Sequence, residues 1–222
     1  MPPARRDRRP PGFTLIELVT VMAIIAILAA FSFGAVKGAQ QRAALARAKS
    51  NLAALGTALE EYKRHYGDYP QLAEFAQAAL TPTSTTTGPG ITTAQAKLFN
   101  CLTGVFGPRV FTNDGRLNGP NLLDIGKFSL NGTLTATFQV VSTSPPKPPF
   151  KQEQNISLLD PWGRRYLYYY KNARVPALWQ APGYVLYSTG PDGQHTAPPA
   201  TGVSTIAQLT TTTNSDNVYA TP

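Results

Sequence analysis

Cysteine is almost absent from this chain of 222 residues, which contains Cys101 alone. A single thiol forms no intrachain disulfide, so a disulfide framework is excluded. Cys101 lies on the apolar side of a predicted short helix. The position predicts a small buried side chain and not a reactive thiol.

Histidine is also scarce, and the usual catalytic motifs are missing. The two histidines are His65 and His195. The sequence contains no H-E-x-x-H, G-x-S-x-G, phosphate-loop or dinucleotide-binding pattern. His195 has no nucleophile at an informative spacing, and His65 is predicted to be solvated at a helix end. We therefore expect a protein that is not an enzyme.

The formal net charge is +8, yet the sequence does not indicate a nucleic-acid-binding surface. Lysine and arginine are scattered, without a continuous stripe interleaved with aromatic residues. The tyrosines of residues 166–170 are more simply explained as strand residues. Four of the 20 basic residues and one of the 12 acidic residues lie in residues 1–12, so the remaining chain carries +5.

Proline is absent between Gly12 and Pro70, and long apolar runs occur only in this part of the chain. Residues 13–33 are almost all apolar, about 21 positions, which is enough to cross a bilayer as a helix. Glu17 is the one ionisable residue of that run. Placing a charged carboxylate at this depth in a bilayer costs free energy, so we expect Glu17 to have a function. The alternative is an acid that reaches back to the interface.

Three simpler interpretations of the N-terminus were weighed. A secretory signal needs a small-residue cleavage site after its apolar stretch, and residues 29–32 fit one only loosely. A twin-arginine signal is suggested by the arginine pairs of residues 5–9, but Asp7 and two prolines interrupt its expected apolar sequel. A plain anchor explains the length and the basic flank. It does not explain Glu17.

The helical pattern continues beyond the apolar run. Apolar residues recur at helical spacing after residue 40 and predict one helix from about Thr14 to His65; they are Leu45, Leu52, Leu55, Leu59, Tyr62 and Tyr66. Gly67 is expected to end it in a left-handed conformation. Gly34 and Gly38 either soften the helix or allow close helix contact, and the sequence leaves both readings open.

Residues 67–150 form a variable middle segment. Residues 81–90 have loop composition, and residues 93–106 predict a short helix. Residues 127–141 predict a hairpin about the Asn131–Gly132 turn, and the prolines of residues 145–149 predict an extended connector. Residues 151–222 predict a C-terminal antiparallel sheet, with strands in residues 167–170 and 183–188. The predicted fold class is α+β, a long N-terminal helix packed on a small antiparallel sheet.

Four motifs resemble one known family. Residues 12–17 (G-F-T-L-I-E) after a basic head resemble the type IV prepilin signal. Residues 62–70 (Y-K-R-H-Y-G-D-Y-P), 160–166 (D-P-W-G-R-R-Y) and 188–193 (S-T-G-P-D-G) resemble segments of the type II secretion major pseudopilin family, within the type IV pilin-like superfamily. The resemblance covers the stem and roughly residues 155–195. An insertion of several tens of residues separates the motifs.

The resemblance implies a specific processing chemistry. A prepilin peptidase would cut between Gly12 and Phe13, and the new amine of Phe13 would be methylated. Residues 1–12 would be the leader, 13–33 the transmembrane and assembly half of the helix, and 34–66 its soluble half. In the family, the acid at the Glu17 position pairs with the N-terminal amine of a neighbouring subunit, which offsets the burial of both charges.

The implied function is structural. The chain would be a single-pass bacterial inner-membrane protein with its C-terminal domain in the periplasm, and it would polymerise there into a helical homo-oligomeric filament that drives protein export. Expected partners are identical subunits, minor pseudopilins, the prepilin peptidase and the inner-membrane assembly platform. Alternatives are a type IV pilus subunit for adhesion, motility or DNA uptake, and a single-pass anchored binding domain that does not polymerise.

The resemblance also implies a calcium ion in the loop after the last strand. Calcium prefers six to eight oxygen ligands. Asp192 falls in the S-x-G-x-D-G motif, and Asp216 lies in an acidic and amide segment, residues 214–217. They are the candidate ligands. The alternative is that Asp192–Gly193 is a turn only and Asp216 an exposed tail residue.

Overall fold

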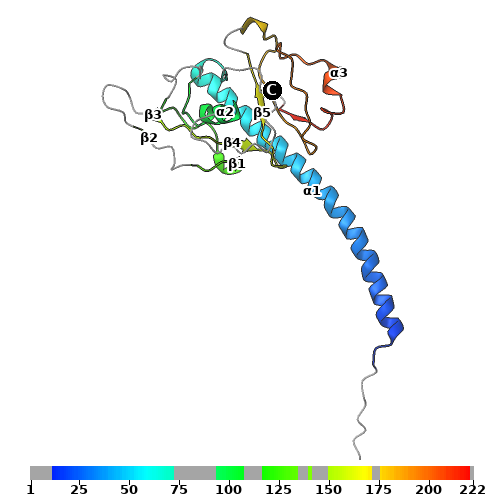
Figure 1. Cartoon of the computed structure of the whole chain (residues 1–222). Coiled ribbons are helices and arrows are strands. Elements are labelled where there is room, and N and C mark those ends of the chain that lie inside the picture. Colours follow the sequence, from blue (N-terminus) through cyan, green and yellow to red (C-terminus); the bar gives the residue numbers. More distant parts are fainter. Residues whose placement is uncertain are drawn as a thin grey trace, which may run out of the picture. The chain divides into compact units, whose positions relative to one another are not determined.

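The computed structural model describes residues 12–72, 94–107, 117–134, 140–141, 150–171 and 176–220 (Figure 1). The chain divides into two compact units, Met1–Ala43 and Ala44–Pro222, which are considered separately. The predicted leader, the loop at 81–90 and the proline connector at 145–149 lie outside the described residues, except for Gly12. The helices are α1 (Leu15–Tyr66), α2 (Ala94–Leu102), η2 (Ile125–Lys127), η3 (Pro176–Leu178) and α3 (Ile206–Leu209).

Helix α1 confirms the long helix expected from the sequence. It begins after Thr14 and ends at Tyr66. Gly67 then takes φ +83°, and its N–H donates to the Lys63 carbonyl at 2.7 Å. That bond satisfies one of the free carbonyls at the helix end. Basic side chains in the last turn also stabilise this end of the helix, because the helix dipole is negative there.

The core of Ala44–Pro222 forms where α1 meets α2 and the small sheets. Four members of the predicted stripe are fully buried, while Leu45 is 39% exposed and lies outside the core. Phe99 and Leu102 of α2, together with Tyr168 and Leu186 of the sheet, complete the cluster. The buried stripe residues are Leu52, Leu55, Leu59 and Tyr62. Burial of these side chains from water is the main stabilisation of the unit.

Within the described residues, the strands form three small antiparallel sheets, which with α1 give the α+β fold class expected from the sequence. A three-stranded sheet has the order β5–β6–β7, and two pairs are β1–β4 and β2–β3. The strands are β1 (Ser129–Asn131), β2 (Val140–Val141), β3 (Phe150–Lys151), β4 (Ser157–Leu159), β5 (Leu167–Tyr169), β6 (Val185–Ser188) and β7 (Val218–Tyr219).

The predicted hairpin about Asn131–Gly132 is wrong. Strand β1 pairs with β4, not with the segment that follows Gly132, and β2 pairs with β3. In the observed register Leu130 lies opposite Leu158. Both side chains belong to the core cluster. Apolar burial between distant segments therefore decides the pairing over the local turn signal.

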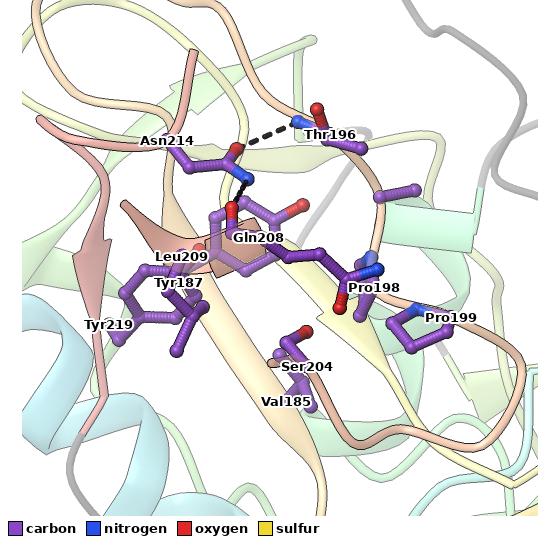
Figure 2. A pocket seen from close by; sticks show the side chains of 11 residues that line it. Val185, Tyr187, Thr196, Pro198, Pro199, Ser204, Gln208, Leu209, Asn214 and Tyr219 are labelled. Carbon is purple, nitrogen blue, oxygen red and sulfur yellow. Dashed lines mark hydrogen bonds between the residues drawn. The ribbon is translucent and has the colours of Figure 1, made fainter. Parts of the chain in front are cut away.

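The second face of the β5–β6–β7 sheet is covered by the C-terminal loop, residues 190–217. Tyr169 and Tyr187 stack with their ring centroids 6.0 Å apart, and Tyr219 packs beside Tyr187. Figure 2 shows loop residues such as Pro198 and Leu209 facing these strand residues. The space left between them is about 20 Å³, room for about one water molecule.

Cys101 is fully buried, as the sequence predicts. It belongs to α2 and packs within the core cluster beside Tyr62 and Leu102. Burial raises the pKa of its thiol to about 12. The thiol is therefore protonated at neutral pH and behaves as a small apolar side chain.

Asp68 ties the end of α1 to the end of β5. Its carboxylate accepts hydrogen bonds from Tyr170 Oη at 2.7 Å and from Gln71 Nε2 at 2.8 Å, and it forms an ion pair with Lys171 Nζ at 2.6 Å. Burial by itself would raise the pKa of Asp68. The bonds from Lys171, Tyr170 and neighbouring groups outweigh that effect, so the pKa lies below its usual value.

Asp68→Asn is expected to destabilise the protein in a pH-dependent way. Because the folded pKa lies below the unfolded one, ionised Asp68 contributes stability above the unfolded pKa of about 3.9, and that contribution is lost as pH falls through the folded pKa. We expect a loss of about 1–2 kcal/mol at pH 7, allowing for partial exposure. Thermal melts at pH 7 and pH 3 test this; an equal loss at both values would contradict it.

Candidate functional site

The residues expected to carry function lie in both compact units. Gly12, Phe13 and Glu17 belong to Met1–Ala43, whereas Asp192 and Asp216 belong to Ala44–Pro222.

The predicted processing site precedes the helix. Gly12 and Phe13 are exposed and lie outside regular structure, because α1 begins only at Leu15. A side chain added at Gly12 would meet nothing within 4 Å. A peptide bond in an extended and accessible segment of this kind can enter a protease active site without prior unfolding of a helix.

The Glu17 side chain binds Thr14 at the start of its own helix. Its Oε2 accepts from the Thr14 backbone N–H at 2.9 Å and from the Thr14 hydroxyl at 2.7 Å. In return, the Glu17 N–H donates to Thr14 Oγ1 at 3.4 Å. This reciprocal arrangement is a capping box, which satisfies helix N–H groups that have no partner within the helix. The resemblance implied only a charge pair for Glu17, although the T-x-x-E pattern of residues 14–17 is the sequence signature of this cap.

The residues around Glu17 present an apolar surface on all sides of the helix. The large side chains are more than half exposed at most of these positions, and Phe13 is 83% exposed. They are Leu15, Ile16, Leu18, Val19, Met22, Ile24, Ile25, Ile27 and Leu28. A helix that is apolar all round is stable in water only when other apolar groups cover it.

The sequence predicts a bilayer crossing at residues 13–33. Within the part of the chain that the structure describes, no helix meets the length and hydropathy expected of a membrane span.

The second site begins at the D-P-W-G turn. Asp160 is 2% exposed. Its Oδ1 accepts from the N–H groups of Trp162 and Arg164 at 3.0 and 2.8 Å, and its Oδ2 accepts from Ser188 Oγ at 2.5 Å. Burial raises the pKa of Asp160, although the bonds from Ser188, Arg164 and Trp162 act in the opposite direction.

The structure brings Asp192 and Asp216 together, but through the backbone of Asp192. The Asp192 N–H donates to Asp216 Oδ2 at 3.1 Å. The Asp192 carboxylate itself accepts from the Gln194 N–H at 2.8 Å, which is the turn geometry weighed as the alternative. Asp216 is only partly exposed, so it is not an exposed tail residue. Among the described residues, no group of three or more His, Cys, Asp or Glu side chains converges.

Three residues of this region were missed by sequence reasoning. Ser188 links the two turns, Arg164 donates from Nη1 to the Gly190 carbonyl, and Asn214 accepts from the Thr196 N–H at 2.8 Å. The bond between Asn214 and Thr196 is drawn in Figure 2. The S-x-G-x-D-G pattern contained a signal for Ser188. Nothing local identifies Arg164 or Asn214, because their partners lie far away in the sequence.

His195 is positioned by the sheet. Its Nδ1 lies 2.9 Å from Tyr187 Oη, and the two rings meet edge to face. Burial lowers the pKa of His195. The neutral side chain therefore anchors the C-terminal loop at neutral pH. His65, in contrast, is exposed at the last turn of α1, as predicted.

Comparison with known proteins gives two matches. Residues 8–33 match the family model of the prokaryotic N-terminal methylation motif. The chain is also 33% identical over 77 residues to the type II secretion system core protein G of Vibrio cholerae serotype O1. That alignment covers 35% of this chain and 53% of the relative, so it spans about half the length of the protein it matches. No solved structure matches the chain.

The first match covers the N-terminal motif that suggested part of the resemblance. The family model covers Gly12, Phe13 and Glu17, and the relative is a secretion protein. Together, the N-terminal motif and the 33% identity support the similarity of this chain to the type II secretion pseudopilins.

Proposed function

We propose that this chain is a structural subunit of a periplasmic pseudopilus, which polymerises to drive protein export by a type II secretion system. The observation that carries the proposal is the N-terminal methylation motif joined to a helix with apolar side chains exposed on all sides. Such a surface needs a lipid or an apolar protein partner. A filament core of packed helices supplies that partner after assembly, and the inner membrane supplies it before.

The remaining parts of the assignment follow from this role. Residues 13–33 cross the inner membrane once before assembly, with the C-terminal domain in the periplasm. The partners are other copies of this chain, minor pseudopilins, the prepilin peptidase and the membrane assembly platform. The role is mechanical and not catalytic. A type IV pilus subunit is the second candidate, and the interlocked D-P-W-G and S-x-G-x-D-G turns favour secretion over it, because those motifs resemble the secretion branch.

Processing gives the direct test. When the chain is expressed with a prepilin peptidase, mass spectrometry is expected to find a mature N-terminus at Phe13 that carries one methyl group. Gly12→Val is expected to block cleavage, because a branched side chain restricts the backbone at the scissile bond. An intact leader in the wild-type chain would remove the basis of the proposal.

A calcium ion is a further part of the proposal. The β6–β7 pairing sets Ser188 opposite Val218, so Thr189 and Asn217 lie at the same end of the ladder. Buried oxygens at Thr189, Asp216 and Asn217 have no hydrogen-bond partner among the described residues. Buried acceptors without donors are unfavourable, and a cation satisfies them. This donor set fits calcium; Asp216 would supply the buried carboxylate and Asp192 the exposed one.

Calcium is expected to raise the melting temperature of the purified full chain in mild detergent, relative to the same sample with EDTA. A ligand that binds only the folded state stabilises it by mass action. Asp216→Asn is expected to remove most of the shift, and Asp124→Asn, at an exposed position, is the control. A melting temperature that does not respond to calcium would refute this part of the proposal and leave the filament role untouched.

A further inference from the structure

Two turns that are far apart in the sequence lock into each other at the entry of the C-terminal loop. Asp160 binds the Ser188 hydroxyl, and the Gly190 N–H donates to the same hydroxyl at 3.2 Å. Arg164 belongs to the Asp160 turn, because the Asp160 N–H donates to its carbonyl at 2.7 Å. The turn therefore fixes the backbone of Arg164, and its side chain extends from there to the loop.

The Arg164 side chain crosses from the first turn to the second. Its Nη1 donates to the Gly190 carbonyl. Its guanidinium also lies against Gly193: a Cβ added at Gly193 would stand 2.3 Å from Nε and 2.5 Å from Cζ. An arginine can make both contacts, because its planar guanidinium donates hydrogen bonds from its edge and can pack with its face against other groups.

The loop that follows is closed by contacts within the protein. The Asp192 N–H binds Asp216, and the Thr196 N–H binds Asn214. The Gln180 N–H donates to the Thr201 carbonyl at 2.8 Å. Trp179 lies against Gly202, where an added Cβ would stand 2.6 Å from the indole ring. Arg164 holds the entry of this loop, and the other contacts hold its middle and its exit.

We propose that Arg164 is the latch of the C-terminal loop: it fixes residues 190–193 against the D-P-W-G turn, so that residues 190–217 stay closed over the sheet without a bound cation. The inference does not depend on the filament role. A calcium ion at Asp216 would be added to a loop that is already closed.

Hydrogen exchange of the full chain in EDTA, read by mass spectrometry, tests the latch. The reporters are the N–H groups of Asp192, Gln194 and Thr196, which are hydrogen-bonded within the loop. We expect these amides to be protected in the wild-type chain. Arg164→Ala is expected to speed their exchange tenfold or more, while amides of β5 and β6 keep their protection. Arg64→Ala removes the same side chain from the exposed surface of α1 and is the matched control.

A second pair of variants tests the latch without changing the arginine. Gly193 and Gly67 have similar backbone angles, φ +73° and +83°. An added Cβ would meet the Arg164 side chain at Gly193, whereas at Gly67 it would meet nothing within 4 Å. Both alanine variants carry the same backbone strain. Gly193→Ala is therefore expected to displace Arg164 and release the loop, and Gly67→Ala is not.

Several results would overturn the proposal. These are loop amides that exchange freely in the wild-type chain with EDTA, loop protection that survives Arg164→Ala, or equal loop exchange in the Gly193→Ala and Gly67→Ala variants. If Arg164→Ala unfolds the whole domain, the glycine pair decides the question, since it leaves Arg164 in place.

Discussion

Glu17→Ala is expected to reduce incorporation of the chain into filaments to background. The proposed filament places the Glu17 carboxylate next to the amine of a neighbouring Phe13 in apolar surroundings, where an unpaired charge is strongly unfavourable. The same carboxylate caps α1 through Thr14 in the single chain. Assembly therefore requires Glu17 to exchange a partner in its own chain for one in the next. Chemical cross-linking of the periplasmic filament in cells, with the cross-linked oligomers quantified by immunoblotting, gives the measurement.

Two further variants separate the charge from the cap. Glu17→Gln keeps an oxygen that can accept from Thr14 but removes the charge, and it is expected to fail like Glu17→Ala. Thr14→Ala keeps the charge and removes the cap, and it is expected to assemble. Each variant must first show cleavage before Phe13 by mass spectrometry. Wild-type filament levels with Glu17→Ala would favour the anchored, non-polymerising alternative.

Asp160→Ala is expected to destabilise the domain more than any surface change. The substitution removes the acceptor of the buried Ser188 hydroxyl and of the partly buried N–H groups of Trp162 and Arg164. Each unsatisfied buried group costs about 1–3 kcal/mol, so we expect a total loss of about 3 kcal/mol or more. For a domain of this size that corresponds to a fall in melting temperature of about 10 °C.

Asp160→Asn and Asp124→Ala are the matched comparisons. Asparagine retains one acceptor oxygen and offers an amide to Ser188, and because burial raises the pKa of Asp160 the loss of charge itself is mild. Its effect is expected to be well below that of alanine. Asp124 forms an exposed ion pair with Lys127, and such pairs contribute about 0–1 kcal/mol. Equal melting temperatures for Asp160→Ala and Asp124→Ala would contradict the assigned role.

The sequence was sufficient for features that depend on near neighbours. The helix from Leu15 to Tyr66 follows from a 3.6-residue period and from Gly67 at its end, and both act within a few residues. The strand around Tyr168 was predictable for the same reason. The pairing of Ser129–Asn131 with Ser157–Leu159 was not, since the first strand lies in the variable middle segment and the pairing depends on the burial of apolar side chains from distant segments.

Some residues of the candidate sites could likewise be predicted from the sequence, and others could not. Gly12, Phe13 and Glu17 form a contiguous motif, and the family-model match over residues 8–33 includes all three. Asp192 and Asp216 were named together only as candidate calcium ligands in a loop after the last strand. The structure does bring them together, but the loop lies between β6 and β7. Arg164 could not be foreseen. Its importance depends on the Gly190 carbonyl 26 residues later, and only the folded chain brings the two together.

The burial of Cys101 has a practical consequence. The chain has this one cysteine, it is fully buried, and its thiol is protonated at neutral pH. Thiol-specific labels therefore leave the native protein unmodified. Cysteines introduced at exposed positions, such as Ile206 on α3 or Lys49 on α1, would react alone. Spin labels or cross-linkers attached there can measure spacings between subunits without removal of the natural cysteine.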